Sequence, residues 1–315
     1  MSNSKIKLAI VGVGKIVNDQ HLPAIANVGQ YELIATASRN GAVKGVTSYT
    51  DIESMLQAEP AIEAVALCMP PQFRYSAARC ALSRGVDVLL EKPPGATVCE
   101  VEQLLDLAKQ NDRRIYATWH SRYAPAVEQT KAFLEQPEVT IESVQIHWKE
   151  DVKKWHPGQE WIWQAGGMGV FDPGINGLSI LTYILPKPFY VQSAELLFPS
   201  NRSAPIAANV DYKTADGITV KGEFDWRIIG DEKWNIDIKT NSGLLSLRNG
   251  GAQLQFDGEV LSEPEHSAYS EYEAIYQNFA NIIRTKVSDV DLLPLKLVAD
   301  AFLLGDREQV DAFNY

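Results

Sequence analysis

Two glycines near the N-terminus form the first pattern that can do chemistry. Gly12 and Gly14 end an apolar run, and a helix is expected to begin a few residues later. Without side chains, the backbone can turn tightly and approach a pyrophosphate, whose charge meets the N–H groups of the helix start. Two glycines alone are a weak signal, and Val17 replaces the third glycine of the usual G-x-G-x-x-G pattern. The strand before this turn makes it a predicted dinucleotide site, formed by Gly12, Gly14, Lys15 and Ile16.

The end of the second predicted strand bears on the choice between NAD and NADP. An NAD site usually has Asp or Glu there, about 20 residues beyond the glycines, to bind the ribose 2′-hydroxyl. Here the strand ends in Ser38 and Arg39, followed by Asn40, without a carboxylate. Arginine can pair with a 2′-phosphate, and a hydroxyl can donate a hydrogen bond to it. Alternatively, Arg39 only stacks on adenine or is solvated. We predict that NADP is preferred and that NAD is also accepted.

Asp172 and Asn176 form a second pattern. They are four residues apart, so on a helix they project from one face and reach the same substrate. A carboxylate can accept a proton, which asparagine cannot do. Alternatively, Asp172 followed by Pro173 is a helix N-cap with proline at the first position. A cap needs neither the preceding glycines nor Asn176, so we predict that Asp172 is the first candidate for the general base and that Asn176 is a catalytic residue beside it.

Lys92 directly follows the predicted strand 86–91 and is the third candidate. Its ammonium can orient a hydroxyl and stabilise a developing alkoxide, and its pKa can fall if it is buried near a cofactor. A lysine after a strand is more often solvated. Glu91 and two following prolines restrict this backbone, which favours an inward side chain. We predict that Lys92 is a catalytic residue that contacts both cofactor and substrate, as the alternative to Asp172 as proton acceptor, and that Glu91 contributes to the cofactor site.

The first 120 residues are expected to form the framework of the dinucleotide site. Nearly continuous apolar runs indicate parallel strands covered by helices on both faces. Strand–helix alternation of this kind predicts a Rossmann fold, a doubly wound parallel sheet. The expected strands are 8–12, 32–38, 63–69, 86–91 and 113–119, with helices near 19–28, 51–58, 73–84 and 97–110.

Residues 121–315 are expected to form an α+β domain for substrate binding and oligomerisation. Longer strands separated by Gly and Asn turns predict a large, mostly antiparallel open sheet built as a meander. The expected strands are 140–150, 190–198, 217–227, 234–240, 243–249 and 252–258, with helices at 170–184, 268–285 and 294–304. The last helices can also pack back on the first domain, residues 1–120.

Three motifs in order resemble those of the Gfo/Idh/MocA oxidoreductases. They are GVGKI with Gln20–Ala24, Glu91–Pro94, and Gly166–Gly169 followed by Asp172–Asn176. The resemblance implies hydride transfer at C4 of a nicotinamide, with the substrate held between the two domains. Many members have histidine at the position of Asn176, so here another residue must act as the base.

A narrower resemblance is to the bacterial L-arabinose/D-galactose 1-dehydrogenases. It is carried by EKPPGAT (91–97), Trp155–Pro157 and FDPGIN (171–176). It implies that NADP⁺ is reduced while the C1 hydroxyl of L-arabinose, D-galactose or D-fucose is oxidised to an aldonolactone. The alternatives are another sugar or cyclitol oxidoreductase of the family, or a catalytically silent, NADP-responsive sugar-sensing regulator. Asn176 argues against cyclitol oxidation, and the presence of Lys92 and Asp172 argues against the regulator.

Further polar and aromatic residues are candidates for binding the sugar. Carboxylates can bind vicinal hydroxyls, and an indole face can pack on sugar C–H groups. The predicted sugar site consists of Lys92, His120, Glu150, Trp155, His156, Asp172, Asn176 and Trp234. His21 is expected at a helix start near the cofactor, and Trp161 and Trp163 are expected to pack in the core.

Composition limits the partners of this 315-residue chain. A net charge of −11 disfavours nucleic acid and anionic membranes. No apolar stretch approaches the roughly 20 residues of a membrane span, and no signal peptide is evident, so we expect a cytoplasmic protein. Cys68, Cys80 and Cys99 are expected to be reduced thiols, and no metal site is predicted. The family resemblance implies a homodimer or homotetramer formed through the C-terminal sheet.

Overall fold

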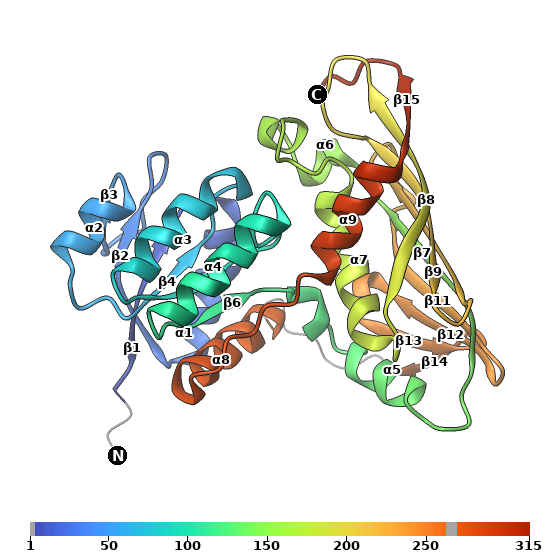
Figure 1. The fold of residues 1–315 in the computed structure, drawn as a ribbon, viewed down its shortest axis with the longest axis horizontal. Coiled ribbons are helices and arrows are strands. Elements are labelled where there is room, and N and C mark those ends of the chain that lie inside the picture. The colour runs from blue at the N-terminus through green and yellow to red at the C-terminus, as the bar shows by residue number, and fades with distance from the viewer. Residues whose placement is uncertain (1–3, 263–269) are drawn as a thin grey trace. The chain divides into compact units, whose positions relative to one another are not determined.

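The computed structural model describes residues 4–262 and 270–315. These residues form two compact units, each built on one β-sheet (Figure 1). The first unit contains residues 4–120 together with 270–291, and the second contains 121–262 together with 292–315. Of the predicted C-terminal helices, one therefore belongs to the first unit and one to the second.

The first unit contains a six-stranded parallel sheet with the order β3-β2-β1-β4-β5-β6. Strands β1, β4 and β5 are almost entirely buried, as predicted from their apolar sequences. The strand order reverses between β1 and β4, where the carboxyl ends of the strands form the usual ligand site of such sheets. The predicted Rossmann fold is therefore confirmed. The strands are β1 (Ile6–Val11), β2 (Tyr31–Ala37), β3 (Thr47–Tyr49), β4 (Ala64–Leu67), β5 (Asp87–Leu90) and β6 (Ile115–Ala117).

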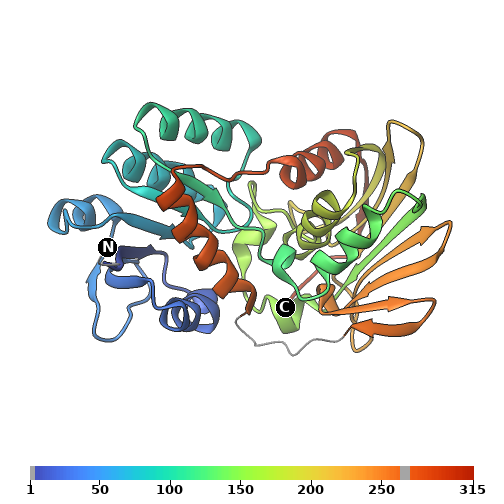
Figure 2. The same cartoon turned by 90° about the horizontal axis from the view of Figure 1, so that it is seen from below.

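Helices cover both faces of this sheet. Helices α3 and α4 lie side by side on one face, whereas α1 and α8 lie together on the other (Figures 1 and 2). Helix α8 comes from near the end of the chain and buries an apolar face that includes Ile275 and Phe279. The helices are α1 (Leu22–Val28), α2 (Ile52–Ala58), α3 (Arg74–Ser83), α4 (Val98–Gln110) and α8 (Ser270–Thr285). The expected positions 268 and 269 of α8 lie outside the described residues.

The second unit contains a nine-stranded sheet with the order β14-β13-β12-β11-β7-β10-β9-β8-β15. Most neighbours are antiparallel, as predicted. The predicted meander is wrong in one respect, because β7 pairs in parallel with β10, and β8 pairs in parallel with β15. The strands are β7 (Ile141–Lys149), β8 (Phe189–Pro199), β9 (Ala207–Thr214), β10 (Thr219–Asp225), β11 (Lys233–Thr240), β12 (Gly243–Arg248), β13 (Gln253–Phe256), β14 (Glu259–Ser262) and β15 (Asp306–Val310).

Helices α5 (Val127–Leu134), α7 (Phe171–Ile184) and α9 (Leu293–Leu304) lie along one face of this sheet (Figures 1 and 2). Helix α7 packs closely on the sheet. A Cβ atom at Gly174 would lie 2.6 Å from the ring of Phe224, and one at Gly177 would lie 2.7 Å from the ring of Trp148. Such close approach needs glycine. A short helix, α6 (Val152–Trp155), follows β7. None of the helices in the described residues has the length and apolar character needed to cross a bilayer.

Candidate active site

The glycine turn after β1 has the geometry that a dinucleotide requires. Gly12 has φ +87°, and a Cβ atom there would lie 2.6 Å from the backbone nitrogen of Met69, so the protein's own packing requires glycine. A Cβ atom at Gly14 would meet no atom within 4 Å. Packing therefore does not explain Gly14, whereas the open space beside it suits the close approach of a phosphate. The turn fits a dinucleotide cofactor.

The residues after this turn start a π-helix (Val17–His21), where an ordinary helix was expected. Val17, at the place of the missing third glycine, is fully buried. Lys15 is exposed and forms an ion pair with Asp19, one turn further on. Ile16 is 38% exposed. Lys15 and Ile16 thus lie on the solvent side of the helix start.

Ser38 and Arg39 follow β2 as predicted. The Ser38 hydroxyl accepts a hydrogen bond from the backbone of Asn40. The Arg39 guanidinium is exposed and lies 5.8 Å from the centre of the Phe73 ring. Within the described part of the chain, no carboxylate forms an ion pair with Arg39. Its charge is thus available to a phosphate.

Lys92 follows β5, and buried groups hold its backbone. Oε2 of Glu91 accepts a hydrogen bond of 2.6 Å from the Lys92 amide. The guanidinium of Arg74, on α3, donates to the carbonyls of Glu91 and Pro93. The Glu91 side chain also accepts a 2.8 Å bond from the Tyr272 hydroxyl, and the residue is only 3% exposed. Its carboxylate is thus engaged inside the unit. Through its bond to the Lys92 amide, Glu91 positions the backbone of Lys92.

His21 forms a buried ion pair with Glu91. Nε2 lies 3.2 Å from Oε1 of Glu91, and Nδ1 lies 2.7 Å from the Tyr276 hydroxyl. Burial alone would lower the pKa of His21, but the Cys68 thiol and the Glu91 carboxylate raise it to about 10. Burial would raise the pKa of Glu91, but the hydrogen bond and charge of His21 lower it to about 2. Both groups are therefore charged at neutral pH.

His120 and Trp119 follow β6 and contact the same C-terminal segment. Nδ1 of His120 lies 2.6 Å from Oε2 of Glu271, and its ring stacks on that of Tyr272 with centres 5.5 Å apart. The Trp119 indole donates to the Asp291 carbonyl and is buried. His120 thus lies close to the Tyr272–Glu91 contact.

In the second unit, Glu150 is the centre of a second group of predicted residues. It directly follows β7 and is 5% exposed. Oε2 accepts a 2.7 Å hydrogen bond from the Trp234 indole, and Oε1 accepts one of 3.2 Å from the Trp226 indole. Nε2 of His156 lies 3.4 Å from Oε1. We call Glu150, His156, Asp172, Trp226 and Trp234 the acid–tryptophan cluster.

Asp172 joins this cluster through His156, whose Nδ1 lies 3.8 Å from Oδ2 of Asp172. Asp172 is 4% exposed and is the second residue of α7. The N-cap of α7 is Val170, so the alternative interpretation of Asp172 as the cap is wrong. Asn176 lies one turn further on and is the one residue among the first ten of α7 that is not buried. Asp172 and Asn176 are thus placed on one helix at the spacing that the sequence predicted.

Trp155 lies beside the cluster, at the end of α6. Its indole donates a 2.6 Å hydrogen bond to Glu232, and its ring lies edge-on to Trp234 with centres 5.7 Å apart. Trp155 is 45% exposed. An exposed indole held in one orientation offers an apolar face to a sugar.

Sequence reasoning missed four side chains that hold these groups. Trp226 is placed opposite Glu150 because Asp225 of β10 pairs with Lys149 of β7. Arg74, Tyr272 and Tyr276 contact the Glu91–His21 pair or its backbone. These side chains give no signal by themselves, since strand pairing places Trp226, the packing of α8 places Tyr272 and Tyr276, and the start of α3 places Arg74.

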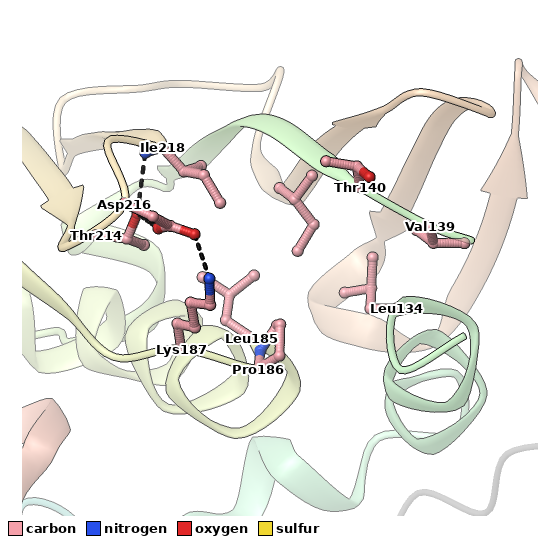
Figure 3. Close-up of a pocket in the computed structure, with 10 residues that line it drawn as sticks. Leu134, Val139, Thr140, Leu185, Pro186, Lys187, Thr214, Asp216 and Ile218 are labelled. Carbon is pink, nitrogen blue, oxygen red and sulfur yellow. Dashed lines mark hydrogen bonds and ion pairs between the residues drawn. The ribbon is translucent and has the colours of Figure 1, made fainter. Parts of the chain in front are cut away.

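The second unit also contains a cavity of about 180 Å³ (Figure 3). Its walls are largely apolar, including Leu134, Leu185 and Ile218, and one ion pair, Lys187–Asp216, lies at its edge. No residue of the predicted site lines it. Among the described residues, no group of three or more His, Cys, Asp or Glu side chains is placed to hold a metal ion.

Comparison with known proteins identifies the class that the fold and these residues define. Residues 6–118 match the family described as "Oxidoreductase family, NAD-binding Rossmann fold", and the protein belongs to this Gfo/Idh/MocA family. The predicted family is thereby confirmed.

More specific relatives cover nearly the whole chain. The sequence is 44% identical to a galactose 1-dehydrogenase of Pseudomonas fluorescens over 98% of each protein. It is 57% identical to a D-galactose-1-dehydrogenase from Rhizobium etli, whose crystal structure matches with a TM-score of 0.94 over 100% of this chain and 99% of that one. A 3-ketoreductase from Actinomadura kijaniata, KijD10, solved with NADP, is 17% identical with a TM-score of 0.82 over 98% and 100% of the two chains, and shares the fold.

Proposed function

We propose that this protein oxidises the C1 hydroxyl of a free aldose to the aldonolactone, with D-galactose, L-arabinose and D-fucose as substrates and NADP preferred to NAD. The observation that carries the proposal is the acid–tryptophan cluster. Two buried carboxylates, Glu150 and Asp172, lie on either side of His156, and indoles orient one of them. The identity of 44–57% to galactose 1-dehydrogenases over nearly the full chain supports the same reaction.

Each polar group has a chemical role in this proposal. Gly12, Gly14, Ser38 and Arg39 would hold the nicotinamide cofactor, which when bound accepts a hydride from C1. Asp172 accepts the proton of the C1 hydroxyl, and Lys92 stabilises the negative charge that develops on its oxygen. Asn176 donates a hydrogen bond to the substrate. Glu150, His156 and His120 bind the remaining hydroxyls, and the indoles of Trp155 and Trp234 pack on the C–H groups of the sugar.

The proposal is tested by measuring kcat/KM for L-arabinose, D-galactose, D-fucose and D-xylose with both cofactors. The first three sugars share the configuration at C2 to C4, so we expect turnover of all three. Their groups at C5 differ by at most a hydroxymethyl, which typically changes discrimination by only about 1–3 kcal/mol. D-Xylose, with a different C4 configuration, is expected to be poor. Rapid oxidation of myo-inositol without oxidation of L-arabinose would instead indicate a cyclitol dehydrogenase. Cofactor binding without turnover of any aldose would indicate a sensor.

The cofactor preference has its own test, the variant Arg39→Ala. Loss of the guanidinium removes a charged hydrogen-bond donor worth roughly 1.5–3 kcal/mol, so kcat/KM with NADP should fall about 10- to 100-fold. The value with NAD should change little, because NAD lacks the 2′-phosphate. Arg79→Ala, which replaces another exposed arginine of the first unit, is the matched control. Equal values for the two cofactors, unchanged by Arg39→Ala, would contradict the assignment.

Self-association through the nine-stranded sheet is proposed as well, as a homodimer or homotetramer. One face of this sheet carries no helix of the described residues (Figure 1). Side chains on that face form cross-strand ion pairs, including Lys149–Glu223 and Arg248–Asp237. Light scattering on the purified protein measures the number of subunits.

A further inference from the structure

Residues 313–315 contact a buried tryptophan of the second unit. The Trp163 indole donates a 3.0 Å hydrogen bond to the Tyr315 hydroxyl. The Trp163 ring also packs on Phe313, with centres 5.1 Å apart and planes inclined by 36°. Trp163 is 2% exposed, so these two aromatic residues form one wall of its surroundings. The sequence predicted only core packing for Trp163.

Trp163 in turn packs on the acid–tryptophan cluster. Its ring lies edge-on to Trp226, with centres 5.2 Å apart and an interplanar angle of 66°. Trp226 is 1% exposed and donates the 3.2 Å hydrogen bond to Oε1 of Glu150. The Trp226 ring also lies 5.2 Å from that of His156. Phe313, Trp163, Trp226 and Glu150 therefore form a continuous series of contacts.

Phe313 also contacts the helix that precedes His156. Nζ of Lys153, on α6, lies 5.5 Å from the centre of the Phe313 ring. Helix α6 ends at Trp155, and His156 is its C-cap. Phe313 thus contacts α6, the helix that His156 caps, and reaches Trp226 through Trp163.

Residues 313–315 are themselves fixed by polar contacts. The Phe313 amide donates a 2.9 Å hydrogen bond to Asn201, whose side-chain amide donates a 3.0 Å bond to the Phe313 carbonyl. The Arg202 guanidinium donates to the same carbonyl and lies 5.5–6.0 Å from the centres of the Trp163, Phe313 and Tyr315 rings. Main-chain and side-chain contacts therefore give the two aromatic rings one orientation.

We propose that Phe313 and Tyr315 are positioning residues of the sugar site, which act through Trp163 and Trp226 on the carboxylate of Glu150. This inference rests on the proposed function, in which Glu150 binds sugar hydroxyls. A binding group is precise only when packing locks the side chains that orient it. Removing the Phe313 ring leaves a space into which Trp163 can move. Any shift of Trp226 then weakens one of the two indole bonds that orient Glu150.

The experiment compares Phe313→Ala with a matched control, Phe198→Ala. Both phenylalanines are half-buried and lie beneath an arginine, Arg202 for Phe313 and Arg307 for Phe198, but Phe198 is outside the contact series. For Phe313→Ala we expect the KM for D-galactose and L-arabinose to rise roughly tenfold, which corresponds to about 1.4 kcal/mol. The kcat should fall less, and the KM for NADP should not change. Phe313→Tyr keeps the aromatic ring, so its KM for the sugars should stay near the wild-type value. Tyr315→Phe should raise this KM less than Phe313→Ala does.

Sugar binding followed by intrinsic tryptophan fluorescence gives a second readout that needs no turnover. An unchanged sugar KM and dissociation constant in Phe313→Ala would overturn the inference. Equal increases in KM for sugar and NADP, with a lowered Tm, would also overturn it, because they indicate a general loss of stability. If the wild-type protein binds an aldose but oxidises none, the proposed function fails, while the fluorescence titration still tests Phe313. If the wild-type protein neither binds nor oxidises an aldose, both are overturned.

Discussion

Replacing Asp172 by alanine is expected to lower kcat for aldose oxidation about 10²- to 10⁴-fold, the usual cost of losing a general base. Asp172 is buried at the start of α7, where Oδ2 lies 3.8 Å from a nitrogen of His156. Asn176 is the neighbouring polar residue of the helix and cannot take over proton acceptance. The measurement is steady-state formation of reduced cofactor from D-galactose at saturating sugar.

Two further variants separate proton acceptance from folding. Asp172→Asn keeps the shape of the side chain and removes its basicity, so we expect the same loss of kcat with an unchanged Tm. Asp216→Ala removes a carboxylate that pairs with Lys187 beside the cavity in Figure 3, and it should leave kcat unaltered. An Asp172→Ala protein that keeps more than about a tenth of wild-type kcat would rule out Asp172 as the base.

Lys92→Ala should cause a comparable collapse of kcat, because stabilisation of charge in a transition state cannot be replaced by tighter substrate binding. The first unit is expected to remain folded. The Glu91 carboxylate accepts a hydrogen bond from the main-chain N–H of Lys92, and an alanine at this position would keep that N–H. The Arg74 guanidinium donates hydrogen bonds to the carbonyls of Glu91 and Pro93. The measurement is kcat and KM for both sugar and NADP, together with Tm.

Whether kcat or KM changes distinguishes a catalytic lysine from a binding one. A change confined to KM would show that Lys92 binds ground state and transition state equally. Lys109→Ala, at the exposed end of α4, is the control for loss of a positive charge from the first unit. Its kinetic constants should match those of the wild type.

Apolar strands of the first unit could be predicted because they are buried on both faces. Their sequences are therefore nearly continuous apolar runs, which are recognisable without a structure. Other strands could not be predicted. β15 (Asp306–Val310) is mostly charged and exposed, and pairing with β8 makes it a strand. β3 has only three residues, none of them buried. The direction of a strand relative to its neighbour could not be predicted either. Buried and less buried side chains alternate along β10 in the same way whether it pairs with β7 in parallel or antiparallel.

The same distinction applies to the site. Glu150, Lys92 and Asp172 could be proposed because each lies at the end of a strand or the start of a helix beside a recognisable motif. The groups that orient them are distant in sequence. Trp226 reaches Glu150 through the pairing of two strands, and Tyr272 reaches Glu91 through the docking of α8. Glu91 is an example, because its motif predicts a role at the cofactor site but does not reveal that its carboxylate contacts Tyr272 and His21.

The docking of α8 has a consequence for biosynthesis. The helix supplies the hydroxyls that bond His21 and Glu91, and its aromatic residues cover Tyr31 and Tyr116. A ribosome makes this helix only after residues 121–262 of the second unit have been synthesised. Until then the nascent Rossmann sheet exposes apolar surface and a charged pair without its tyrosine partners, a state prone to aggregation. A gene shortened after codon 120 would thus encode a protein that lacks one side of its own core.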